Sequence, residues 1–190
     1  MRQGDVDRYT QAIEAGFYDL RARLGTTRSS CQLKFSNANR WLKPTDLLEF
    51  RQDDGKLHHT DRLRCCNSQI SDELKASGSD KECEDGPKLG ALLNNPQSSL
   101  RFVRMEGTPE SKNVEISVSR TSYELTPPGT SASTVPITFV VRSKQASNTP
   151  QLRQRCVQIA GTGHLLSGTW DGSLSRGRCN AQGAATLPNS

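Results

Sequence analysis

The apolar residues of the N-terminal segment "DVDRYTQAIEAGFYDLRARLG" recur at steps of three and four, and no other feature restricts the fold of this chain as strongly. Such steps place side chains on one face of an α-helix. The segment predicts an amphipathic helix over residues 5–25, with Asp5 as its N-terminal cap and Gly25 at its end. Gly16 weakens an isolated helix, so we expect packing of the apolar face to hold it. That face carries Val6, Tyr9, Ile13, Phe17, Leu20 and Leu24.

The C-terminal part of the chain has a different pattern. Short alternating or β-branched runs are separated by clusters of Pro, Gly, Ser and Thr, which is typical of antiparallel strands. The clearest runs are "NVEISVS", "SYELTP", "PITFVVRS", "RCVQIA" and "GHLLSGTW". They predict an antiparallel β-sheet over residues 115–179, and hence an α+β fold in which the N-terminal helix packs on the sheet.

The region between these parts is less regular. Residues 31–114 combine short apolar pairs with Asn, Pro and many charges, which predicts short strands or turns and then a long, variable, loop-rich excursion. Residues 180–190 are expected to form a flexible tail. A chain of 190 residues fits one domain of ordinary size, so we predict a single domain over residues 1–190.

Six cysteines are spread along the chain without the Cys-x-x-Cys spacing of structural zinc sites, so disulfides are the expected state. Hydrophobic residues make up only 33 % of the chain, and disulfides would compensate for a thin core. Such staples imply an oxidising compartment. The spacing alone leaves the pairing of these residues open: Cys31, Cys65, Cys66, Cys83, Cys156 and Cys179.

The first residues, "MRQGDVDRYT", are polar and do not form the apolar run of a secretion signal. A disulfide-bearing chain needs an export signal, because disulfides form outside the cytoplasm. We therefore expect that a natural N-terminal segment precedes the helix and that Met1 stands in its place.

The segments "SYELTPPGTSASTVPITFVVRS" and "RCVQIAGTGHLLSGTW", together with the N-terminal helix, resemble minor pilins and pseudopilins of the FimT and GspH type. The similarity covers the helix and residues 115–171, and it is loose over residues 31–114. It implies a pilin-like globular head in which "RCVQIAGTGHLLSGTW" is a β-hairpin with turn glycines Gly161 and Gly163. It also implies that Cys156 anchors the C-terminal tail to Cys179.

The same resemblance implies a biological setting. Members of that family begin with a short leader, which is cleaved and the new N-terminus methylated, followed by about 20 apolar residues. By analogy, the missing segment would anchor this protein in the inner membrane and join it to other pilin subunits in a type IV pilus or related filament. The expected location is the cell surface or periplasm.

Basic residues dominate the end of the chain. After residue 125 there is one acid, Asp171, against six basic residues, which favours contact with polyanions. In DNA-uptake pilins of the FimT kind a Gly-Arg-x-Arg arrangement contacts DNA, and "SLSRGRC" is similar but differs in order. The resemblance makes Arg176 and Arg178 the first candidates for binding double-stranded DNA. Supporting candidates are Arg142, Lys144, Arg153 and Arg155.

Two combinations of residues could support other chemistry. His58 and His59 with Cys65 and Cys66 offer zinc-ligand types, but adjacent ligands rarely close one tetrahedron. Cys156 with His164 as its base lacks an orienting third group and an oxyanion hole. No phosphate loop, nucleophile elbow or dinucleotide fingerprint occurs, so we predict a non-enzyme with no metal and no cofactor.

Three functions therefore stay open from the sequence. The first is a structural minor-pilin subunit, and the second is a DNA-binding pilin that serves DNA uptake. The third is a secreted, disulfide-rich binding domain unrelated to pili. A charge excess is also compatible with a merely solvated basic surface.

Overall fold

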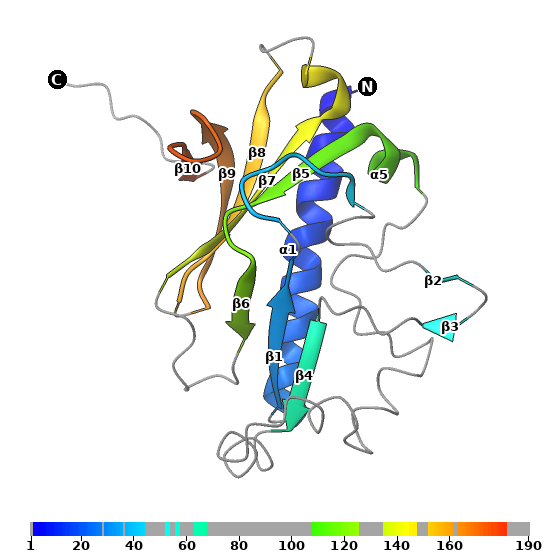
Figure 1. Ribbon diagram of the computed structural model, residues 1–190, viewed down its shortest axis with the longest axis vertical. Coiled ribbons are helices and arrows are strands. Elements are labelled where there is room, and N and C mark those ends of the chain that lie inside the picture. The colour runs from blue at the N-terminus through cyan, green and yellow to red at the C-terminus, as the bar shows by residue number, and fades with distance from the viewer. Residues whose placement is uncertain are drawn as a thin grey trace, which may run out of the picture.

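The computed structural model describes ten stretches of the chain and shows an α+β fold with a long N-terminal helix on an antiparallel sheet (Figure 1). The described stretches are residues 2–27, 29–35, 37–44, 52–53, 56–57, 63–67, 108–125, 135–147, 152–161 and 163–181. The predicted fold class is confirmed at this level: one N-terminal helix, an antiparallel sheet and one disulfide.

The main sheet has five strands in the order β10-β9-β8-β7-β5, and all neighbours are antiparallel. Its strands are β5 (Val114–Val118), β7 (Ile137–Ser143), β8 (Gln154–Ile159), β9 (Leu165–Asp171) and β10 (Arg178–Ala181). Two short helices flank it, α5 (Pro109–Asn113) before β5 and the 3-10 helix η1 (Lys144–Ser147) after β7. These strands form the predicted antiparallel sheet, except that the run "SYELTP" contributes β6 (Ser122–Leu125), which belongs to a different sheet.

Helix α1 (Arg2–Thr27) is the predicted amphipathic helix, but both predicted ends are wrong, because Asp5 lies in its first turn and the helix continues past Gly25. The first four residues of its apolar face are fully buried, namely Val6, Tyr9, Ile13 and Phe17. Thr10 is also buried, and its hydroxyl donates to the carbonyl oxygen of Val6 at 2.7 Å, which lets a polar residue sit beside the stripe. The side chains of Leu20 and Leu24 lie outside the described part.

The core lies between α1 and the sheet. Alternate residues of β5, β7 and β8 face the helix, as the two-residue period of a strand requires. These residues are Val114, Ile116, Val118, Ile137, Phe139, Val141, Val157 and Ile159, all at most 1 % exposed. Phe35 closes one side of this core with an edge-to-face contact to Phe139 at 5.7 Å between ring centroids.

A second sheet has the order β4-β1-β6. It pairs β1 (Ser29–Lys34) with β4 (Leu63–Asn67) and with β6 (Ser122–Leu125), while β2 (Gln52–Asp53) and β3 (Lys56–Leu57) pair with each other as two short antiparallel strands. Strand β4 lies in the region for which the sequence indicated loops. Residues 37–42 then run beside β5, where Leu42 and Ile116 exchange both backbone hydrogen bonds at 2.8 and 2.9 Å.

The hairpin predicted around Gly161 and Gly163 is present as the β8–β9 pair. Gly163 has a φ of 79°, which only glycine adopts at little cost, and its carbonyl accepts a hydrogen bond from Arg21 at 3.0 Å. Gly161 is not among the described glycines with positive φ. The turn therefore depends on one of the two predicted glycines. Of the predicted tail, residues 180 and 181 belong to β10, and residues 182–190 lie outside the described part.

Candidate functional site

The two leading candidate arginines lie on the hairpin that joins β9 to β10. Arg176 is in the turn, where its backbone N–H donates to the Ser173 carbonyl at 3.2 Å, and Arg178 begins β10 opposite Asp171. Both side chains are exposed. Neither forms an ion pair with any residue that the structure describes. We call residues 172–178 the arginine hairpin.

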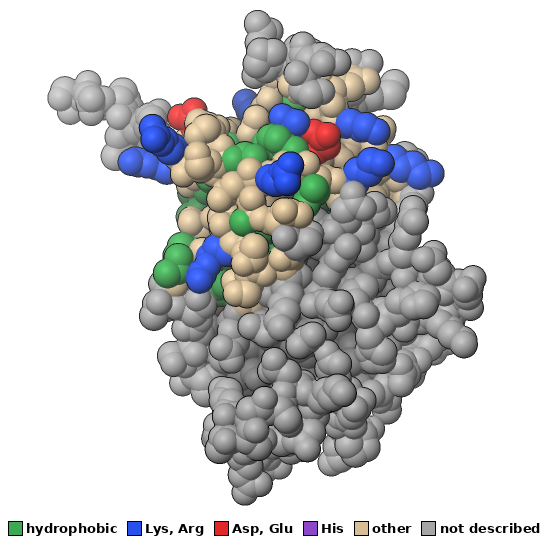
Figure 2. Space-filling view, in the orientation of Figure 1, with side chains coloured by type: hydrophobic (Ala, Val, Ile, Leu, Met, Phe, Trp, Pro, Cys, Tyr) green, Lys and Arg blue, Asp and Glu red, His purple; other side chains and the backbone are tan. Residues whose placement is uncertain are grey.

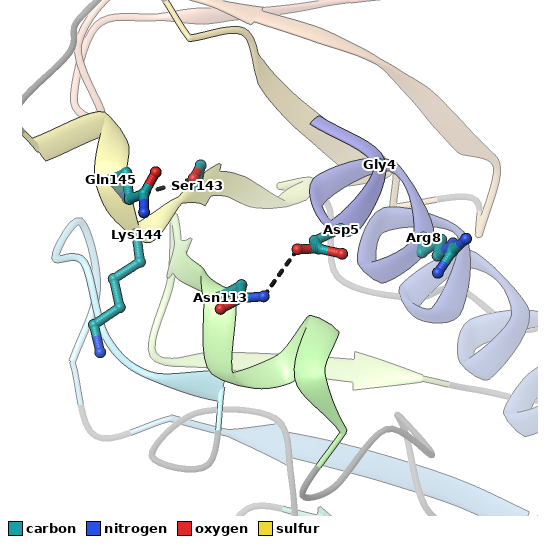
Figure 3. Close-up of a pocket in the computed structure, with 7 residues that line it drawn as sticks. All are labelled: Gly4, Asp5, Arg8, Asn113, Ser143, Lys144 and Gln145. Atoms are coloured by element: carbon teal, nitrogen blue, oxygen red, sulfur yellow. Dashed lines mark hydrogen bonds between the residues drawn. The ribbon is translucent and has the colours of Figure 1, made fainter. Parts of the chain in front are cut away.

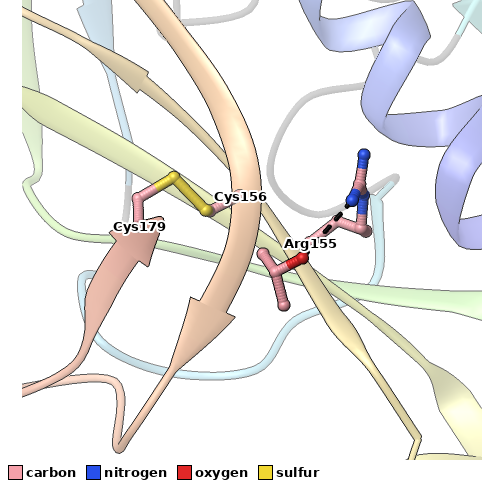
Figure 4. Close-up of a disulfide and its surroundings, with 4 residues drawn as sticks. Arg155, Cys156 and Cys179 are labelled. Carbon is pink, nitrogen blue, oxygen red and sulfur yellow. Dashed lines mark hydrogen bonds between the residues drawn. A yellow bond between two sulfur atoms is a disulfide. The ribbon is translucent and has the colours of Figure 1, made fainter. Parts of the chain in front are cut away.

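A disulfide ties this hairpin to the body of the sheet. Cys156 of β8 bonds to Cys179 of β10, with 5.8 Å between their Cα atoms, as the resemblance implied (Figure 4). The two cysteines belong to strands that both neighbour β9, so the bridge crosses β9. Cys156 is fully buried and lies opposite Gly168 in the strand register.

Gly168 allows β10 to approach β9 closely. A side chain at this position would overlap the backbone carbonyl of Asn180 in β10. The backbone of β10 therefore occupies the space that a Cβ atom of β9 would need. The sequence indicated a strand through "SGTW" but not this close approach, and the only available signal was a glycine inside a strand pattern.

The turn of the arginine hairpin is packed rather than open. A Cβ atom on Gly177 would lie 2.5 Å from two indole carbons of Trp170, and Gly172 has a φ of 100°. The backbone of Gly177 therefore rests on the Trp170 ring. The indole Nε1 of Trp170 is buried without a hydrogen-bond partner among the described residues. The part of the ring around Cε2 and Cζ2 is thus covered inside the hairpin.

Four of the six basic candidates meet at one end of the main sheet. Strands β7 and β9 end at the edge where β8 and β10 begin, which is the upper end in Figure 1. Arg153, just before β8, and Lys144, just after β7, join Arg176 and Arg178 there, and all four are exposed. We call these four residues the basic end. Figure 2 shows Lys and Arg side chains over the upper part of the described face, with few Asp or Glu among them.

Arg142 is engaged within the fold. It forms an ion pair with Glu115, its cross-strand partner, at 2.7 Å from Nη2 to Oε2. Its guanidinium also lies 4.1 Å from the centroid of the Trp41 ring. Both contacts direct the charge to neighbouring side chains, so Arg142 serves the packing of β5 and β7.

Arg155 is the second basic candidate that serves the fold. It is 7 % exposed and faces α1, on the side of the sheet opposite the disulfide (Figure 4). Its Nε lies 3.2 Å from Asp7 Oδ1, and its Nη1 lies 3.4 Å from Thr169 Oγ1. A guanidinium must be exposed to contact a DNA phosphate, so the buried Arg155 side chain cannot make that contact.

A cavity of about 680 Å³ adjoins the basic end (Figure 3). It is lined by Gly4, Asp5, Arg8, Asn113, Ser143, Lys144 and Gln145. Charges of both signs line it, and several are already paired: Asn113 donates to Asp5 at 2.9 Å, and Arg8 pairs with Glu110 at 2.9 Å. A hydrogen bond donated by its own backbone amide, and then one donated by Arg8, lower the pKa of the Glu110 carboxyl. These two pairs connect α1 to α5 beside the cavity.

The zinc and nucleophile combinations are not assembled in the described part of the chain. Cys156 is held in the disulfide, so its sulfur is not a thiolate that His164 could activate. His58, His59 and Cys83 lie outside the described residues, as do the side chains of Cys31, Cys65 and Cys66. Among the backbone positions, Cys31 and Cys65 are cross-strand partners. Within the described stretches no group of three metal-ligating side chains occurs.

Comparison of the chain with models of protein families, with curated proteins and with solved structures finds no match. None of the described helices has both the length and the apolar character that crossing a membrane requires.

Proposed function

We propose that this chain is the globular head of a minor pilin-like subunit of a type IV pilus or related envelope filament. The observation that carries the proposal is the packing of α1 by one face only. Val6, Tyr9, Ile13 and Phe17 are fully buried against the sheet, while the opposite face is exposed at Gln11, Ala15, Tyr18 and Ala22. A helix packed in this way contacts the sheet of its own chain with one face and leaves the opposite face open to neighbouring subunits.

The first test is the N-terminus of the natural gene product, isolated from the cell envelope. Intact-mass and N-terminal analysis should show a short leader removed and a methylated residue before an apolar helix. Removal of an ordinary secretion signal would contradict the proposal and would favour the third hypothesis, a secreted, disulfide-rich binding domain.

The second test uses the exposed face of α1. Tyr18 is 54 % exposed, so Tyr18→Glu should leave the head folded but reduce its recovery in sheared filaments. Arg40→Glu, on the exposed segment beside β5, is the matched control and should assemble as the parent does. Equal recovery of all three proteins would contradict a role for this face in assembly.

The basic end supports a second candidate function, the binding of double-stranded DNA. The residues of this end flank four adjacent strands, and three gaps of about 4.8 Å give a width of roughly 14 Å. Guanidinium groups bind phosphate oxygens in a forked geometry that does not depend on base sequence. Because Gly177 packs on part of the Trp170 ring, we expect contact with the phosphate backbone rather than stacking on bases.

This candidate predicts a definite salt dependence. Each neutralised phosphate contributes a slope of about −0.9 to log K against log salt, so four cations give at most roughly −3 to −4. Binding of a random-sequence duplex should be saturable at low salt and should be much weaker, with a smaller salt slope, in the Arg176→Ala, Arg178→Ala variant. The control variant Arg40→Ala, Lys43→Ala removes the same charge from exposed positions beside β5. Equal loss in both variants would show that only net charge matters.

A further inference from the structure

We propose that the Cys156–Cys179 disulfide and the Trp170–Gly177 contact are positioning elements that hold Arg176 and Arg178 in the geometry that a polyanion requires. This inference rests on the second candidate function, binding at the basic end. It adds that the charge of the hairpin is not sufficient and that its fixed placement sets the affinity.

The covalent part of this arrangement is the bridge across β9. Cys179 follows Arg178 directly, so the disulfide fixes the backbone one residue from the guanidinium-bearing position. Its other end, Cys156, is fully buried in β8, the central strand of the main sheet. The start of β10 is therefore tied to the most enclosed part of the sheet. The backbone of β10 at Asn180 also lies close to Gly168 of β9.

The non-covalent part lies under the turn. Gly177 separates the two arginines in the sequence, and its backbone rests on the Trp170 ring. Gly172, at the other end of the turn, is also in contact with Gly177, because a Cβ atom there would lie 2.9 Å from the Gly177 Cα. The two ends of the turn are thus packed together. Arg176 and Arg178 extend from a backbone that has little freedom.

A fixed backbone reduces the entropy that is lost when the arginines bind phosphates. Releasing the hairpin keeps every charge, so the encounter with a polyanion should be unaffected. Electrostatic attraction mainly sets the association rate, whereas the quality of the bound contacts sets the dissociation rate. Loosening the hairpin should therefore accelerate dissociation and leave the salt slope unchanged.

The experiment measures duplex DNA binding and dissociation over a salt series for the parent and for Cys156→Ala, Cys179→Ala. We expect roughly a tenfold weaker affinity, from ordering two freed arginines, with the parent's salt slope and association rate. Circular dichroism establishes that the sheet remains. Arg176→Ala, Arg178→Ala is the contrast, because it should lower the slope itself by about 2.

Gly177→Ala provides an independent variant that keeps the disulfide. Its Cβ atom would be 2.5 Å from Trp170, so the turn must shift while all charges stay. This variant should show the same faster dissociation even if the cysteine variant does not fold. Parental affinity in a folded, loosened variant would overturn the positioning role. A parent without salt-sensitive binding would instead overturn the binding function of the basic end, and the positioning role with it.

Discussion

Asp7 of α1 and Arg155 of β8 form an ion pair in the helix–sheet interface, with 3.2 Å between Asp7 Oδ1 and Arg155 Nε. The Arg155 side chain is 8 % exposed, while that of Asp7 is 45 % exposed. Arg155 shares its side of β8 with Val157 and Ile159, which belong to the core. A charge in that position needs a partner, because an unpaired buried charge is costly. The pair therefore joins the first helix to the centre of the sheet.

This asymmetry predicts unequal effects of removing the two partners. Asp7→Ala removes the carboxylate that faces the buried guanidinium, so it should lower the free energy of unfolding by about 1–3 kcal/mol. Arg155→Met replaces the charge with an apolar chain of similar length and leaves Asp7 in contact with water, so the loss should be below about 1 kcal/mol. Urea unfolding of both variants measures the difference. A larger loss in Arg155→Met would contradict this account of the pair.

The sequence contained part of this information. The run "RCVQI" alternates, and once Val157 and Ile159 are assigned to the core, Arg155 must share their face. The helix stripe and the C-terminal strands were predictable for the same reason, since each depends on a local period. Strand β1 pairs with β6 across a long separation, and no local pattern specifies that contact. The same holds for the approach of Asn180 to Gly168, which depends on how β10 pairs with β9.

Adjacent positions in α1 provide a second prediction. Phe17 is fully buried, whereas Tyr18 is 54 % exposed on the other side of the helix. Phe17→Ala should reduce the free energy of unfolding by about 3–5 kcal/mol through loss of burial and a new cavity. Tyr18→Ala should cost less than about 1 kcal/mol. Chemical unfolding of the two variants compares them directly, and similar losses would mean that the helix packs by a different face.

The two glycines Gly168 and Gly4 should respond in opposite directions to alanine. Gly168→Ala forces β10 away from β9, which should destabilise the protein by about 1–3 kcal/mol or more. Gly4 lies in α1, and a Cβ atom added there would meet nothing within 4 Å, so Gly4→Ala should stabilise by up to about 1 kcal/mol. Thermal unfolding gives both signs. A neutral Gly168→Ala would be incompatible with the close approach of Asn180.

Glu110 predicts a pH dependence of stability. Its own backbone amide and Arg8 lower its pKa in the folded protein from the ordinary value of 4.5. A lowered folded pKa means that the unfolded chain binds the proton first, so the stabilisation is complete above the unfolded pKa and is lost as pH falls through the folded pKa. Unfolding measured from pH 6 to pH 3 should therefore show a smaller decline in Glu110→Gln than in the parent. Arg8→Gln should also flatten the profile, and an unchanged decline in both variants would contradict the pairing.

The six basic candidates should separate into two classes that respond to different measurements. Arg142 is paired with Glu115 and lies over Trp41, so Arg142→Ala should lower the free energy of unfolding by about 1–2 kcal/mol. Its charge already has a partner, so the salt slope of duplex DNA binding should stay at the parental value.

Arg178→Ala should give the reverse result. The side chain is exposed on the arginine hairpin, so unfolding should change by less than about 0.5 kcal/mol. If the guanidinium neutralises one phosphate, the salt slope should fall by about 0.9. Measuring both quantities on both variants separates charge that holds the fold from charge that meets a ligand. A slope that falls equally for Arg142→Ala and Arg178→Ala would mean that long-range charge, rather than contact at the basic end, attracts the DNA.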